Sequence, residues 1–136
     1  MSVAISGKYT GGLGVELTHG PSGAVIKTAA PVDNQGDGSS FSPTDMVAAG
    51  LGACMLTIMG IVGQRDELDL SGLSFTAEKH MTSGPRRIER VDIVITMPPG
   101  LDSSARKKLE KAAHTCPVKN SLGSDVQTPV RFQYPD

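Results

Sequence analysis

Residues 42–65 read SPTDMVAAGLGACMLTIMGIVGQR, and the rest of the chain has to pack around the helix that this run predicts. Ser42 is the expected N-cap, Pro43 fits the first helical position, and Asp45 falls three residues after the cap, as in a capping box. The helix should continue to about Arg65, where the apolar pattern stops.

The middle of this run has some features of a membrane span, because residues 46–63 carry no charge and approach the necessary length. Four glycines interrupt it, and strand-like segments lie on both sides. A buried helix of a soluble protein fits better. Glycine costs about 1 kcal/mol relative to alanine in a helix interior, so several glycines indicate close packing against a sheet or a second helix.

Alternating apolar and polar residues predict strands before and after this helix. Residues 1–40 are rich in glycine and indicate a three-stranded antiparallel meander followed by a polar loop. Residues 72–82 and 91–95 alternate in the same way, and Ser83-Gly84-Pro85 supplies a turn between them. These two segments therefore predict a hairpin.

The last third of the chain predicts an amphipathic helix, a short helix and a final strand. The amphipathic helix turns Leu109 toward the core, while Arg106 and the neighbouring lysines face water. The short helix should cover residues 116–122. Residues 126–134 alternate as a strand, and Pro129 favours an edge position in its sheet.

Length and composition limit the class of protein. The chain of 136 residues is most simply one domain, residues 1–136, with a core that association would strengthen. Thirteen basic and fourteen acidic residues nearly cancel, so nucleic acid is not an expected partner. The N-terminus has no apolar signal segment, and two cysteines do not make a disulfide scaffold. We expect a cytoplasmic protein without membrane attachment, in which any disulfide is transient and catalytic.

Cys54 and Cys116 are the main candidates for chemistry. Cys54 lies in the apolar helix, where many cysteines only pack. Cys116 precedes Pro117 at an expected helix N-terminus, which lowers a thiol pKa and favours the reactive thiolate. This local argument makes Cys116 either the better nucleophile or an inert capping residue. A thiol shielded in the core and a second one at a helix start could form a peroxide-reducing pair.

Other titratable residues have simpler interpretations. His80, His114 and the two cysteines could together supply four zinc ligands, but they lack the paired short spacing of a zinc motif, so no metal is expected. Asp45 could be a catalytic carboxylate, although its place in the capping box already explains it.

Two motifs resemble the OsmC/Ohr family of osmotically inducible and organic hydroperoxide resistance proteins. The first combines SPTD at residues 42–45 with AAGLGAC at residues 48–54, and the second is CPV at residues 116–118 with Ser121-Leu122. The hairpin and helix between the motifs match the family in order and length. The resemblance therefore covers nearly the whole chain.

This resemblance implies an α+β, OsmC-like fold in which antiparallel sheets wrap a long central helix, and an intertwined homodimer. It also implies thiol-dependent reduction of organic hydroperoxides, with hydrogen peroxide as a candidate second substrate. Cys54 would be the peroxidatic cysteine and Cys116 the resolving one. An external dithiol would reduce their disulfide, and no metal or organic cofactor would take part.

The family's activating residues do not occur at matching positions. Characterised members pair the reactive cysteine with an N-terminal arginine and with a glutamate, which the hydroperoxide resistance branch carries ten residues before that cysteine. Here no arginine precedes Arg65, and the corresponding position before Cys54 is Thr44. Asp45 follows it, about 100° further around the helix. The candidate supporting residues are therefore Thr44, Asp45, Lys27 and His114.

The missing arginine and glutamate leave a second class of function open. The chain could keep the fold as a non-catalytic stress protein that binds a small hydrophobic ligand near Cys54. The two cysteines favour the peroxidase.

Overall fold

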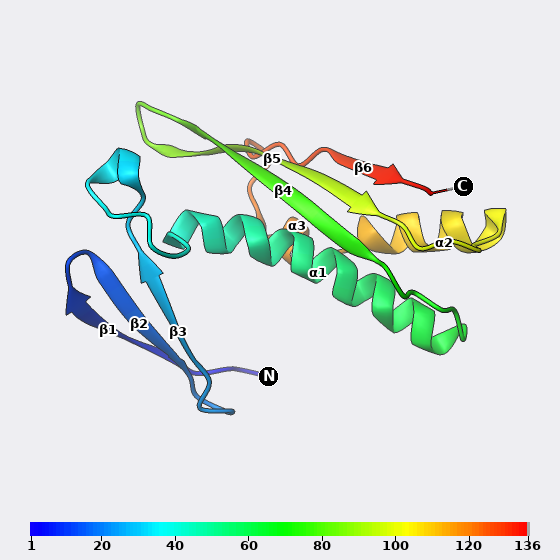
Figure 1. Cartoon of the computed structure of the whole chain (residues 1–136), viewed down its shortest axis with the longest axis horizontal. Coiled ribbons are helices and arrows are strands. Elements are labelled where there is room, and N and C mark those ends of the chain that lie inside the picture. The colour runs from blue at the N-terminus through cyan, green and yellow to red at the C-terminus, as the bar shows by residue number, and fades with distance from the viewer. Residues whose placement is uncertain (136) are drawn as a thin grey trace. The chain divides into compact units, whose positions relative to one another are not determined.

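The computed structural model describes residues 1–135, with two sheets and a long helix, α1, in an α+β fold (Figure 1). The α+β class with a central helix is thus confirmed. The elements are β1 Ile5–Gly11, β2 Gly14–His19, β3 Val25–Ala29, η1 Val32–Asn34, α1 Pro43–Arg65, β4 Ser74–Thr82, β5 Arg87–Thr96, α2 Ser103–Ala113, α3 Pro117–Ser121 and β6 Val130–Gln133. Contacts group the chain into two compact units, residues 1–47 and 48–136, and the single domain stays a prediction.

The first unit contains the predicted meander, with antiparallel strands in the order β1-β2-β3. Gly11 and Gly12 have φ values of 86° and 60° at the turn between β1 and β2, which explains the glycine pair. The register places Ile5, Tyr9 and Ile26 on one face of the sheet, and all three are exposed. The strands therefore leave an apolar face uncovered.

Helix α1 begins and ends where the sequence predicts. The Ser42 N–H donates to Asp45 Oδ2 at 2.8 Å, and the Asp45 N–H donates to Ser42 Oγ at 3.1 Å, which is a reciprocal capping box. By length and composition α1 could cross a membrane, and 39% of its most apolar window is buried in the protein. Core helices of soluble proteins meet the same criterion, so this finding is weak support for a span.

The four glycines of α1 lie in two different environments. A Cβ at Gly52 would lie 2.1 Å from the Phe75 ring, and a Cβ at Gly63 would lie 2.5 Å from a leucine side chain. Gly50 and Gly60 have no neighbouring atom within 4 Å of that position. Close packing is therefore present on one side of α1, whereas the other side is open in the chain.

The second sheet has the strand order β4-β5-β6, and β4 and β5 form the predicted antiparallel hairpin. β6 pairs parallel to β5, so the expectation of purely antiparallel sheets is wrong. The reason is the long connection through α2 and α3, which returns the chain to the starting end of the sheet. The last strand begins at Val130 rather than at 126, and it lies at the sheet edge, as Pro129 predicts.

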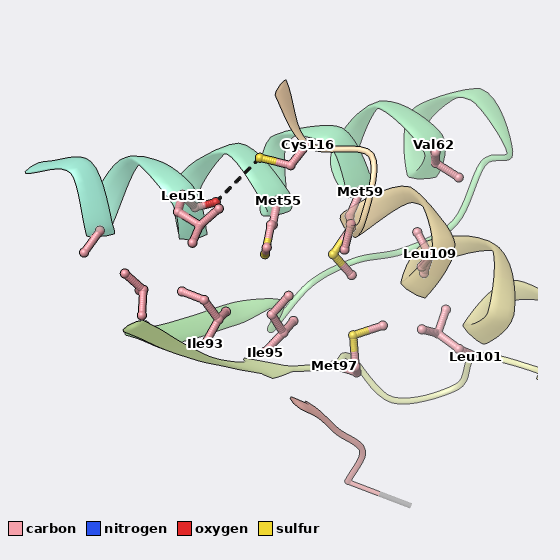
Figure 2. Close-up of a cluster of buried hydrophobic side chains, with 13 residues drawn as sticks. Leu51, Met55, Met59, Val62, Ile93, Ile95, Met97, Leu101, Leu109 and Cys116 are labelled. Carbon is pink, nitrogen blue, oxygen red and sulfur yellow. Dashed lines mark hydrogen bonds between the residues drawn. The ribbon is translucent and has the colours of Figure 1, made fainter. Parts of the chain in front are cut away.

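One hydrophobic core lies between α1, α2 and the second sheet (Figure 2). It is built from aliphatic and methionine side chains, as a chain without tryptophan requires. Met side chains adapt to irregular gaps, which suits a core made by two helices and a twisted sheet. Its fully buried members include Leu51, Met55, Met59, Ile93, Ile95, Met97, Leu109 and Cys116.

Helix α2 buries Leu109 as predicted, but Arg106 does not simply face water. The Arg106 guanidinium lies 4.2 Å from the centre of the Tyr134 ring, a cation–π contact. The Tyr134 hydroxyl donates a short hydrogen bond to Glu110 Oε2. Together these contacts attach the segment after β6 to α2.

Candidate functional site

The fold brings Cys54 and Cys116 together, although 62 residues separate them in the sequence. Cys54 is on α1, and Cys116 is the residue that caps α3. Cys54 lies near enough to raise the pKa of the Cys116 thiol, and both cysteines are free thiols. Two neighbouring thiols are suited to reversible disulfide chemistry.

The two cysteines differ in burial. Cys116 is fully buried, with 0% of its surface exposed, whereas Cys54 is only partly buried. The sequence predicts that Cys54 is the thiol shielded in the core, whereas the structure buries Cys116 more completely. Cys116 is a member of the main core, which places the start of α3 against α1.

The Cys116 thiol has a second partner on the central helix. Its Sγ donates a weak hydrogen bond to the carbonyl oxygen of Leu51 at 3.9 Å, and Leu51 lies three residues before Cys54 (Figure 2). This bond holds the sulfur close to the turn of α1 that carries Cys54.

Burial raises the pKa of the Cys116 thiol above its ordinary value, and the nearby Cys54 side chain acts in the same direction. The backbone N–H groups of Lys119 and Val118 oppose this shift, although the sulfur makes no regular capping hydrogen bond. The local prediction that a helix start lowers this pKa is wrong, because desolvation outweighs the end of a five-residue helix. Cys116 therefore keeps its proton at neutral pH.

Thr44 and Asp45 are occupied at the start of α1. The Thr44 hydroxyl lies 3.2 Å from Ser42 Oγ, and the Asp45 carboxylate accepts the capping bond from Ser42. Cys54 follows nine residues after Asp45, which is about 14 Å along a helix axis. The capping interpretation of Asp45 accounts for its contacts, and neither side chain lies beside the Cys54 of its own chain.

Lys27 and His114 lie in different surroundings. Lys27 is exposed on β3, opposite Glu16 of β2. His114 caps the C-terminus of α2, two residues before Cys116, with its Nδ1 3.4 Å from Lys119 Nζ. Of the four supporting candidates, His114 is thus the one that lies next to the cysteine pair in the sequence.

The zinc ligands considered from the sequence do not form a cluster. His80 Nε2 lies 2.8 Å from Asp92 Oδ2 on the neighbouring strand. Within residues 1–135 no group of three or more His, Cys, Asp or Glu side chains is placed to hold a metal ion.

Sequence reasoning missed two features of this site. One is the hydrogen bond from Cys116 to the Leu51 carbonyl oxygen. Every residue has a backbone carbonyl, so the sequence gives no signal for this partner. The other is the Phe75 ring against Gly52, two residues before Cys54. The glycines of α1 predict close packing against a sheet or a second helix, but they do not identify the residue in contact.

Comparison with known proteins agrees with this architecture. The family model described as OsmC-like protein matches residues 36–131, which is well over half of the chain. The chain belongs to the OsmC-like family.

The similar proteins cover almost the whole chain. An uncharacterised protein from Acinetobacter baylyi is 30% identical over 124 residues, which span 88% of this chain and 85% of that protein. A crystal structure from Psychrobacter arcticus, described as an osmotic stress induced and detoxification response protein, is 40% identical, with a TM-score of 0.91 over 98% of this chain and 96% of that one. The organic hydroperoxide resistance protein OsmC of Legionella pneumophila shares the fold, with 19% identity and a TM-score of 0.77 over 98% and 97% of the two chains.

Proposed function

We propose that this chain is a thiol-dependent peroxidase that reduces organic hydroperoxides through Cys54 and Cys116. The observation that carries the proposal is that Cys54 and Cys116, which are 62 residues apart in the sequence, lie near each other in the fold. Membership of the OsmC-like family and the fold shared with a hydroperoxide resistance protein support it.

The unequal burial of the thiols supports Cys54 as the attacking residue. Cys54 is the partly buried cysteine in the single chain, so it is the more accessible of the two to a peroxide. Cys116 is fully buried and its raised pKa keeps it protonated, which makes it a poor first nucleophile. Its position near Cys54 instead suits Cys116 to resolve an oxidised Cys54, once its thiol has lost the proton.

The reaction then has two chemical steps. The Cys54 thiolate attacks one oxygen of the ROOH peroxide bond, which breaks, and the alkoxide takes a proton to leave as ROH. The resulting Cys54 sulfenic acid condenses with the Cys116 thiol to form the S–S bond, and the sulfenic oxygen leaves as water. An external dithiol supplies two electrons and two protons and restores both thiols.

The residues that activate Cys54 belong to the proposal as well. An arginine and a glutamate at the family's positions are absent, so Lys27, Thr44, Asp45 and His114 remain the candidates. Lysine cannot reproduce the bidentate geometry of arginine. We therefore expect slower peroxide reduction than an arginine-activated site would give, or a different preferred hydroperoxide.

The working form is proposed to be a cytoplasmic homodimer. The open side of α1 exposes Val47 and Ile61 by 38% and 55%, next to Gly50 and Gly60. Small residues flanked by aliphatic ones allow two helices to approach closely. The uncovered apolar face of β1–β3 is a second surface that association can bury.

A thiol titration tests the proposed function. The reduced chain should show two free thiols, and one equivalent of cumene hydroperoxide should remove both, with dithiothreitol restoring them. Retention of both thiols, together with saturable protection of Cys54 by an apolar compound, would favour a non-catalytic ligand-binding protein.

A further inference from the structure

The chain has a pronounced charge asymmetry along its sequence. Residues 103–120, which contain α2, α3 and Cys116, carry five Lys or Arg residues and one Glu, whereas the remainder carries eight basic and thirteen acidic residues. A nearly neutral protein thus concentrates positive charge in the segment that leads into Cys116.

Two of these five cations are engaged in structural contacts. Arg106 stacks on Tyr134, and Lys108 pairs with Asp66 after the C-terminus of α1. The remaining cations are Lys107 and Lys111, both exposed, and Lys119.

Lys107, Lys111 and His114 follow a spacing of four and three residues, which places them in a row on one side of a helix. This row lies roughly opposite the buried Leu109. His114 in turn contacts Lys119 of α3, with 3.4 Å between Nδ1 and Nζ. We name Lys107, Lys111 and Lys119 the cationic row. His114 and Lys119 flank Cys116 in the sequence, and the Lys119 ammonium donates to Nδ1 of His114.

We propose that the cationic row attracts the reductant, and that the reductant is a negatively charged thiol compound. The proposal rests on the proposed disulfide between Cys54 and Cys116. A row of like charges raises the local concentration of anions, and rates of association rise by about tenfold or more in favourable cases. Thiolates carry negative charge at the moment of attack, so the row favours every thiolate and favours those with a second negative charge most.

The chemistry of the step is ordinary thiol–disulfide exchange. One thiolate attacks a sulfur of the Cys54–Cys116 disulfide and forms a mixed disulfide, releasing the other cysteine as a thiolate that takes up a proton. A second thiolate attacks the mixed disulfide, releases the second cysteine and leaves as the oxidised reductant. Two electrons pass from the reductant to the two cysteines.

Three monothiols of similar size test this inference. They are 2-mercaptoethanesulfonate, 2-mercaptoethanol and cysteamine, whose side groups are negative, neutral and positive. The full-length chain is oxidised with diamide, which does not depend on peroxidase activity. Reduction is followed by quenching with N-ethylmaleimide and intact mass, and each rate constant is divided by the thiolate fraction of the reagent.

At an ionic strength of about 0.01 M, the Debye length is about 30 Å, so the row acts over a long range. The sulfonate should then react at least about threefold faster than 2-mercaptoethanol, and cysteamine should react slowest. At about 1 M salt the three rates should converge. The variant Lys107→Gln/Lys111→Gln should lose most of the preference. The control Lys8→Gln/Arg131→Gln removes two exposed cations elsewhere and should keep it.

Two results would show that the row is only a solvated helix face. One is equal rates for the three thiols. The other is an equal loss of preference in the control and in the Lys107→Gln/Lys111→Gln variant. Failure of diamide to close the disulfide would overturn the inference too, since no substrate for the reductant would exist. If diamide closes the disulfide but hydroperoxide does not, the proposed function fails while the thiol rates still decide the role of the row.

Discussion

The Cys116 sulfur lies 3.9 Å from the carbonyl oxygen of Leu51, one helical turn before Cys54. This contact holds the buried Cys116 against the turn of α1 that leads to the partly buried Cys54. It also keeps Cys116 in a desolvated position, where the neutral thiol is the stable form.

The raised pKa of Cys116 predicts how resolution depends on pH. Only the thiolate of Cys116 attacks the Cys54 sulfenic acid efficiently, and its pKa lies above the ordinary value of 9.0. The thiolate fraction, and with it the rate of disulfide formation, should therefore rise about tenfold per unit between about pH 6 and pH 9. Rapid-quench mass spectrometry after one equivalent of hydroperoxide measures this rate. A rate that levels off below pH 8 would mean that the Cys116 pKa is lowered instead.

Gly52 should tolerate no side chain beside Phe75. A Cβ there would lie 2.1 Å from the ring, so Gly52→Ala should lower the free energy of unfolding by about 1–3 kcal/mol despite the better helix propensity of alanine. Urea denaturation measures the loss. The variant Phe75→Leu removes the clashing ring atoms, and the double variant should recover about 1 kcal/mol relative to the sum of the single effects. Additive effects would contradict the contact.

The open side of α1 predicts the site of self-association. Ile61→Glu places a charge on that side, where Ile61 is 55% exposed in the chain, and should convert the proposed homodimer into monomer at low micromolar concentration. Gln133→Glu, an exposed change on β6, serves as the control and should stay dimeric. Sedimentation equilibrium distinguishes the two. A folded monomer for the unmodified chain would exclude the dimer altogether.

The contact between Tyr134 and Glu110 predicts a measurable stability difference. Tyr134→Phe removes the hydroxyl that donates to the carboxylate, and should cost about 1–3 kcal/mol in the free energy of unfolding. Glu110→Gln keeps an oxygen that accepts this bond and should cost less. Equal losses in the two variants would indicate that the hydrogen bond stabilises the fold only when its acceptor is charged.

The sequence predicted the parts of this fold that local chemistry determines. The capping box of Ser42 and Asp45 set the start of α1, and alternation of apolar residues located the meander and the hairpin. It did not predict that β6 runs parallel to β5, because the direction of pairing depends on the path of the connection and not on the strand's own residues.

The sequence likewise predicted only part of the candidate site. Family resemblance selected Cys54 and Cys116, and the structure brings them together. The local interpretation of Cys116 as an activated thiol was wrong, because it considered the N-terminus of α3 without the core that desolvates the sulfur. Burial depends on how the whole chain packs, so it cannot be predicted from a helix-start motif.

Serine variants of the two cysteines test the assignment of roles most directly. In a single turnover with cumene hydroperoxide, Cys54→Ser should consume no peroxide, because the attacking sulfur is absent. Cys116→Ser should consume about one equivalent per chain and stop as a sulfenic acid that a dimedone probe traps, since only resolution is lost. Peroxide consumption retained in Cys54→Ser and lost in Cys116→Ser would reverse the roles, and no consumption by the unmodified chain would contradict the peroxidase.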